Sequence, residues 1–95
     1  MSVSTATPTT ACYSVTATVD PGLLPRLLGH VARLGAVPSR LHQTAHEDEM
    51  IVDLQVDGLS ASRAALLENR LAGTIGVRWV GFSRKGFAEQ GLFQL

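Results

Sequence analysis

The chain has 95 residues, enough for one domain with a modest core. Hydrophobic residues make up 45% and charged residues 17%, so we expect leftover apolar surface and therefore a dimer or an obligate partner. Eight basic and eight acidic residues cancel, which argues against nucleic acid or an anionic membrane as the main partner, because both call for a basic excess.

The sequence also indicates the cellular compartment and the extent of the N-terminal tail. The single cysteine, Cys12, excludes an internal disulfide and fits a reducing cytosol. No apolar run reaches the roughly 18–20 residues needed to span a bilayer. Residues 1–10 lack the basic start and apolar segment of a secretory signal. We therefore expect a cytoplasmic protein in which residues 1–12 form a flexible N-terminal tail.

The first half of the chain predicts a strand followed by a helix. Residues 13–19 alternate apolar and hydroxyl side chains, as in a strand with one buried face. Residues 24–34 carry leucine and valine at helical spacing. Gly22 is expected as the N-cap, which leaves Pro25 in the first turn, where its missing N–H is not needed. Gly35 should follow the helix C-terminus.

The second half predicts a strand, a polar turn, a strand, a helix and a last strand. They are expected over residues 39–44, 46–49, 50–56, 60–71 and 76–82. In the last strand, Val77 and Trp79 should face one side and Val80 and Phe82 the other. Residues 83–95 mix aromatic and charged side chains and are predicted as a C-terminal tail of unknown role.

This order predicts an α+β, ferredoxin-like βαββαβ sandwich over residues 13–82. Each half is a strand, a crossover helix and a strand, and right-handed crossovers place both helices on one face of a four-stranded antiparallel sheet. The other face stays bare in a monomer. Pairing of sheets or sheet edges between two chains, a homodimer, would cover it.

Enzymatic and metal functions find little support in the residues. The strands lack the stacking aromatics of an RNA-binding module, and the loop at residues 20–22 has neither the Cys-x-x-Cys of a metal chaperone nor a phosphate-binding glycine-rich sequence. His42 and His46 are expected on a strand and in a turn, with their rings on different sides, so no metal site or cofactor is predicted. No catalytic residue is assigned.

The loop and helix resemble those of ACT domains, the small regulatory modules that bind amino acids. The resemblance rests on Val19-Asp20-Pro21-Gly22-Leu23-Leu24, then Leu27-Leu28 and Arg33-Leu34-Gly35. Asp20-Pro21 with Leu24, Arg26, Val31, Arg33 and Gly35 is similar to the small regulatory subunit of acetolactate (acetohydroxyacid) synthase, isozyme II type. Ser62-Arg63, Leu66-Leu67, Leu71 and Val77 extend this similarity, so that it covers residues 13 to 82.

This resemblance implies a non-catalytic subunit in branched-chain amino acid biosynthesis. It would form a homodimer through its sheet and activate a thiamine-diphosphate-dependent catalytic large subunit. A branched-chain amino acid would bind at the dimer interface, with its carboxylate on the backbone amides of Gly22 and Leu23. The candidate ligand-binding residues are Val19, Asp20, Pro21, Gly22, Leu23, Leu24 and Val37.

Two candidate positions depart from the family pattern. Valine-sensitive relatives carry an Asn or Asp two residues before the proline, which falls on Val19, and an Asn two residues after the helix-ending glycine, which falls on Val37. Each lost hydrogen bond to a charged ligand costs about 1.5–3 kcal/mol. Asp20 is polar, but its carboxylate would repel that of the ligand, and it is also interpretable as a turn or cap residue. The sequence therefore predicts weak or absent valine feedback. The alternative is a free-standing ACT-domain amino-acid sensor that regulates another enzyme.

Overall fold

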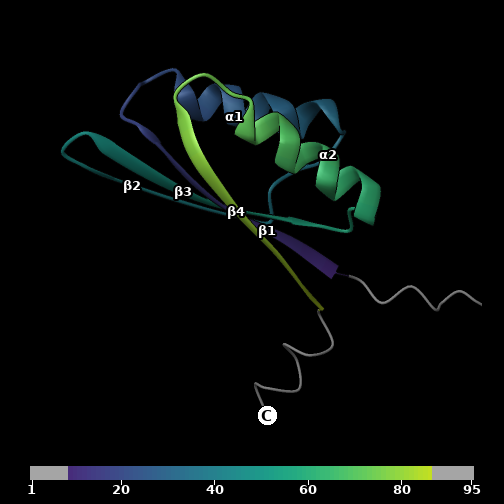
Figure 1. Cartoon of the computed structure of the whole chain (residues 1–95). Coiled ribbons are helices and arrows are strands. Elements are labelled where there is room, and N and C mark those ends of the chain that lie inside the picture. Colours follow the sequence, from purple (N-terminus) through teal and green to yellow (C-terminus); the bar gives the residue numbers. More distant parts are fainter. Residues whose placement is uncertain (1–8, 87–95) are drawn as a thin grey trace, which may run out of the picture.

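The computed structural model describes residues 9–86 and has the predicted ferredoxin-like architecture (Figure 1). Its elements are β1 (Thr9–Thr18), α1 (Leu23–Arg33), β2 (Arg40–His46), β3 (Glu49–Asp57), α2 (Ala61–Ala72) and β4 (Val77–Gly86). The sheet order is β2-β3-β1-β4, and each neighbouring pair is antiparallel. Both helices lie on one face of this sheet, as predicted.

The core lies between the helices and the two central strands. In β1, alternate residues from Ala11 to Ala17 are buried, and in β3 those from Met50 to Val56 are buried. Period-two alternation places these side chains on one face of the sheet, where the helices cover them. Each helix contributes one stripe, Leu23, Leu27 and Val31 from α1 and Ala64, Leu67 and Leu71 from α2.

The helix boundaries follow the capping chemistry. Gly22 is the N-cap of α1, and Gly35 follows its C-cap with φ +71°, a conformation that favours glycine. In α2, the Ser60 hydroxyl accepts a hydrogen bond from the Arg63 N–H at 3.2 Å. Gly73 caps the other end. The Gly22 and Gly35 features agree with the sequence prediction.

The predicted domain boundaries at residues 13 and 82 fall inside strands. β1 begins at Thr9 and β4 continues to Gly86, because the start of β1 pairs with the ends of both β3 and β4. Thr10 is 2% exposed, and its hydroxyl donates to Asp57 Oδ1 at 2.8 Å. This hydrogen bond satisfies the polar group of a buried residue. Cys12 thus lies within β1 rather than in a tail. The remaining residues of both predicted tails, 1–8 and 87–95, lie outside the described residues.

The prediction that Val77 and Trp79 share a face is wrong. Ala17 pairs with Val77 and Thr16 with Trp79, so Arg78 is an extra residue in β4 and the strand carries a bulge. The bulge puts Val77 on the helix side of the sheet and Trp79 on the opposite side.

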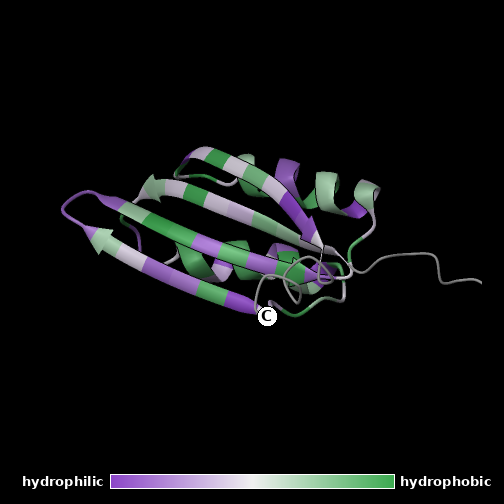
Figure 2. Ribbon diagram, turned by 90° about the horizontal axis from the view of Figure 1, so that it is seen from below, coloured by the Kyte–Doolittle hydropathy of each residue, from purple (hydrophilic) through white to green (hydrophobic). Residues whose placement is uncertain are grey.

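Trp79 lies on the open face of the sheet, which Figure 2 shows from the side away from the helices. Its indole is 61% exposed and is not part of the core. The ring lies over the backbone of Gly81, where an added Cβ would come within 2.7 Å of the ring carbon Cη2. Gly81 therefore gives the indole room to lie along its own strand.

β2 is an edge strand, and Pro38 lies two residues before its start, a position where a missing backbone N–H is tolerated. Each of its seven residues is exposed. It also extends to His46, so His42 and His46 share the open face, contrary to the prediction. Four strand residues separate them by about 13 Å, too far for one metal ion. Among residues 9–86, no group of three or more His, Cys, Asp or Glu side chains is placed to hold a metal.

Candidate functional site

The predicted ligand-binding loop joins β1 to α1 at one end of the domain. Val19 is 48% exposed, whereas Leu23 is fully buried and begins the core stripe of α1. Leu24 is partly buried against the same core. Of the candidate side chains in this loop, Val19, Asp20 and Pro21 are therefore the accessible ones.

Asp20 closes the turn on itself. The Gly22 N–H donates to Asp20 Oδ1 at 3.0 Å, and the Leu23 N–H donates to the Asp20 carbonyl at 3.1 Å. These are the two amides that the family resemblance assigned to a ligand carboxylate, and both are already hydrogen-bonded within the turn. Asp20 is thus the turn residue that its sequence context indicated.

Arg26 completes the closure from the first turn of α1. Its Nη2 atom donates to Asp20 Oδ2 at 2.8 Å and to the Ile75 carbonyl at 3.2 Å. The Arg26 hydrogen bond, together with the Gly22 N–H, holds the pKa of the Asp20 carboxyl below its usual range. A Cβ added at Gly22 would meet Arg26 Nη1 at 2.8 Å, so the guanidinium lies directly over the turn.

A second loop packs beside this turn and was missed by sequence reasoning. The Thr18 N–H donates to the Gly76 carbonyl at 3.0 Å, which ties the α2–β4 loop to the end of β1. The loop presents Ile75, which is 84% exposed. In the sequence, the isolated apolar residue Ile75 between Gly73 and Gly76 was the feature that could have indicated an exposed apolar loop.

A polar contact joins α1 to the same loop. His30 Nε2 lies 3.0 Å from Thr74 Oγ1, and that hydroxyl donates to the Arg70 carbonyl at 2.9 Å. The hydroxyl therefore accepts from His30, and the proton is assigned to Nε2. His30 Nδ1 is buried without a hydrogen-bond partner among the described residues. Burial lowers the pKa of His30, and the nearby Arg33 and Arg70 lower it further.

The structure places Val37 away from the other six candidates. It follows the C-terminus of α1, and the eleven-residue helix separates the two ends by about 16 Å. Within one protomer, the predicted site is therefore split between the two ends of α1.

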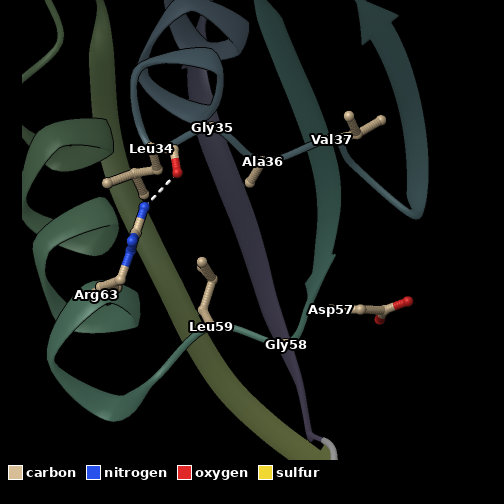
Figure 3. Close-up of a pocket in the computed structure, with 8 residues that line it drawn as sticks. All are labelled: Leu34, Gly35, Ala36, Val37, Asp57, Gly58, Leu59 and Arg63. Carbon is tan, nitrogen blue, oxygen red and sulfur yellow. Dashed lines mark hydrogen bonds between the residues drawn. The ribbon is translucent and has the colours of Figure 1, made fainter.

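Val37 instead lines a hollow of about 380 Å³, which we call the α1–α2 hollow (Figure 3). Residues 34–37 after α1, residues 57–59 before α2, and Arg63 form its walls. The Arg63 guanidinium donates from Nη2 to the Leu34 carbonyl and so bridges the two helices. Sequence reasoning missed this hollow, because it treated Gly35 only as the residue that follows a helix.

The two-layer fold with a closed βα turn defines a small α+β domain of the ferredoxin-like class. The family model described as an ACT-like domain matches residues 4–86, so the chain belongs to this family. ACT domains are typically regulatory and non-catalytic, and they commonly dimerise and bind amino acids.

Solved structures share the fold at low sequence identity. The ACT domain of GTP pyrophosphokinase from Chlorobium tepidum has a TM-score of 0.71 at 14% identity, covering 81% of this chain and 100% of that one. The C-terminal domain of the MgtC protein from Mycobacterium tuberculosis has a TM-score of 0.67 at 14% identity, with coverage of 90% and 97%. The ligand-free regulatory subunit of aspartate kinase from Thermus thermophilus scores 0.63 at 12% identity, with coverage of 84% and 52%. No curated protein matches the sequence.

Within residues 9–86, neither helix combines the length and the apolar character that a membrane crossing requires.

Proposed function

We propose that this chain is the non-catalytic regulatory subunit of acetolactate synthase and activates the catalytic large subunit by protein contact, with weak or absent valine feedback. Membership of the ACT-like family supports a regulatory role. The partner comes from the resemblance of residues 13–82 to the isozyme II small subunit. Exposed apolar side chains on the loop end, Ile75 and Val19, are suited to contact with another protein.

The internal hydrogen bonds of the turn carry the proposal of weak feedback. A ligand carboxylate would have to displace Asp20 Oδ1 from the Gly22 N–H and would meet the negative charge of Asp20 at close range. Val19 and Val37 add no hydrogen bond that would offset this loss. Binding of valine at this turn is therefore disfavoured, whereas contact with a protein partner does not require the two amides.

Homodimerisation through the sheet belongs to the same proposal. The outer edge of β2 has no neighbouring strand in the four-stranded sheet, and all seven of its residues are exposed. Unpaired backbone groups on such an edge favour pairing with another strand. On the open face, Trp79 adds an exposed aromatic ring that a second chain would cover.

The test is reconstitution with the acetolactate synthase catalytic subunit of the same organism. We expect the two chains to co-elute in size-exclusion chromatography, acetolactate formation to rise on mixing, and added valine to leave the rate unchanged. Strong inhibition by valine would contradict the closed turn. Absence of both co-elution and activation would exclude this partner, and ligand-dependent thermal stabilisation by an amino acid would then favour the free-standing sensor.

A further inference from the structure

Two side chains of α1, one helical turn apart, hold the α2–β4 loop, residues 73–76. Arg26 Nη2 donates to the Ile75 carbonyl at 3.2 Å, and His30 Nε2 lies 3.0 Å from Thr74 Oγ1. The exposed apolar side chain of Ile75 is therefore presented by a loop that α1 contacts at two successive residues. One of the two contacts involves a group that titrates near neutral pH.

The hydrogen bonds of Thr74 determine which nitrogen of His30 carries the proton. Thr74 is 7% exposed, and its hydroxyl donates its single proton to the Arg70 carbonyl at 2.9 Å. The hydroxyl oxygen then accepts from His30 Nε2. This leaves His30 Nδ1 as an acceptor that is buried and has no hydrogen-bond partner among the described residues.

A second proton on the imidazole ring is disfavoured in this position. It would lie on Nδ1, where a charged N–H would be buried without an acceptor. The charges that act on the ring, Arg33 from α1 and Arg70 from α2, are both positive. Burial lowers the pKa of His30, and these two arginines lower it further, in agreement with the geometry. The imidazolium therefore forms most easily when the ring turns out to solvent, which breaks its contact with Thr74.

The Arg26 contact does not respond to the same change in pH. An arginine side chain is not deprotonated in proteins. The hydrogen bond from Arg26, together with the Gly22 N–H, holds the pKa of the Asp20 carboxyl below its usual range, so this ion pair stays charged where histidine titrates. Loss of the His30 contact would thus free Thr74 while the Ile75 carbonyl stays bound to Arg26.

We propose that the contact between His30 and Thr74 is a pH-sensitive switch, in which the neutral ring holds the α2–β4 loop against α1 and protonation releases the ring and moves Ile75. Because opening takes up one proton, the ratio of open to closed chains should rise by up to about tenfold for each pH unit below 6.5. The switch is a property of the single chain. Its effect on a partner rests on the proposed function, in which Ile75 is part of the contact surface.

The experiment follows Ile75 by NMR in the isolated full chain as the pH is lowered from about 8 to about 5. Methyl labelling of isoleucine gives a simple spectrum, because Ile51 and Ile75 are the only isoleucines. We expect the Ile75 methyl signals to move with a midpoint below pH 6.5, and the ring ¹⁵N shifts of His30 to place the proton on Nε2 at neutral pH. A proton on Nδ1, or Ile75 signals that do not move in this range, would overturn the proposal.

Four variants separate the switch from other effects of pH. His30→Gln should make the Ile75 signals independent of pH, whereas His42→Gln, which removes an exposed histidine of β2, should leave the wild-type curve unchanged. Thr74→Val removes the accepting hydroxyl and should flatten the curve, and Thr74→Ser keeps the hydroxyl and should retain it.

A curve that persists in His30→Gln or is lost in His42→Gln would contradict the role of His30. Equal curves for Thr74→Val and Thr74→Ser would contradict the role of the hydroxyl, and this comparison still decides if His30→Gln impairs folding. Because these readouts need no catalytic subunit, they fail or succeed independently of the activation experiment.

Discussion

Tyr13 gives the sharpest prediction, because one hydroxyl links the centre of the sheet to α2. The side chain is 2% exposed, and its hydroxyl donates to the Ala64 carbonyl at 2.8 Å. Its ring packs against Phe82 with centroids 5.1 Å apart. Tyr13→Phe keeps the ring and removes only the hydroxyl. The Ala64 carbonyl lies inside α2 and has a second lone pair, so we expect a loss of about 1 kcal/mol in the free energy of unfolding at neutral pH.

The same hydroxyl makes stability depend on alkaline pH. Burial raises the pKa of Tyr13 to about 12, from a usual value of 10.0, and Glu68 acts in the same direction. The folded state thus holds this proton more tightly than the unfolded state does. Its contribution is complete below pH 10.0 and is lost as the pH rises through about 12, by roughly 3 kcal/mol in total.

The assay is urea unfolding of wild type and Tyr13→Phe at a series of pH values between 9 and about 12. The difference between the two proteins isolates the Tyr13 hydroxyl, since this is the only group that the substitution removes. Wild type should lose its advantage over the variant across this window and then become the less stable of the two, because the loss from ionisation exceeds the advantage of about 1 kcal/mol at neutral pH. Tyr13 is the only tyrosine, so its near-ultraviolet absorbance also follows its ionisation directly. Tyrosinate formation near pH 10 in the folded protein, or a constant difference across the window, would refute the reasoning.

Two further predictions concern His30 and Gly81. The pKa of His30 in the folded state lies below its usual value of 6.5, so the neutral ring stabilises the fold above pH 6.5 and this contribution falls as the pH decreases below that value. His30→Gln should remove this part of the pH dependence of the free energy of unfolding, measured by urea unfolding. If the variant kept the same decrease in stability at acid pH, the role given to His30 would be contradicted. Gly81→Ala should displace the Trp79 indole from the strand and so lower its fluorescence anisotropy. The control Ser83→Ala, on the same face of the sheet, should leave the anisotropy unchanged. Equal anisotropy in the two variants would mean that the ring does not rest on Gly81.

The elements were predictable where a local pattern fixes them. Two kinds of signal act within a few residues and can therefore be read from one sequence. They are the alternation in β1 and β3 and the caps at Gly22, Gly35 and Ser60. The bulge at Arg78 does not follow from such a pattern. It depends on how β4 aligns with β1 across the sheet, which no local spacing in β4 records.

The candidate site was predictable in part for the same reason. The role of Asp20 as a turn residue follows from its position before Pro21 and Gly22. The ion pair with Arg26 and the split between the turn and Val37 depend on the length and direction of α1 in space. The α1–α2 hollow combines three segments separated along the chain, and only their packing against the sheet brings Arg63 to Leu34.

The closed turn has a consequence for regulation. Helix N-termini attract anions, and in this chain the anion at the start of α1 is the carboxylate of Asp20 itself. Arg26 holds that carboxylate in place and also holds the Ile75 loop, so the end of the domain is organised without any bound ligand. An effector that acted by ordering this turn would find it already ordered. Under the proposed function, a subunit built in this way would present the same surface to its partner whether or not an amino acid is present, and the proposed activation without feedback would rest on that constancy.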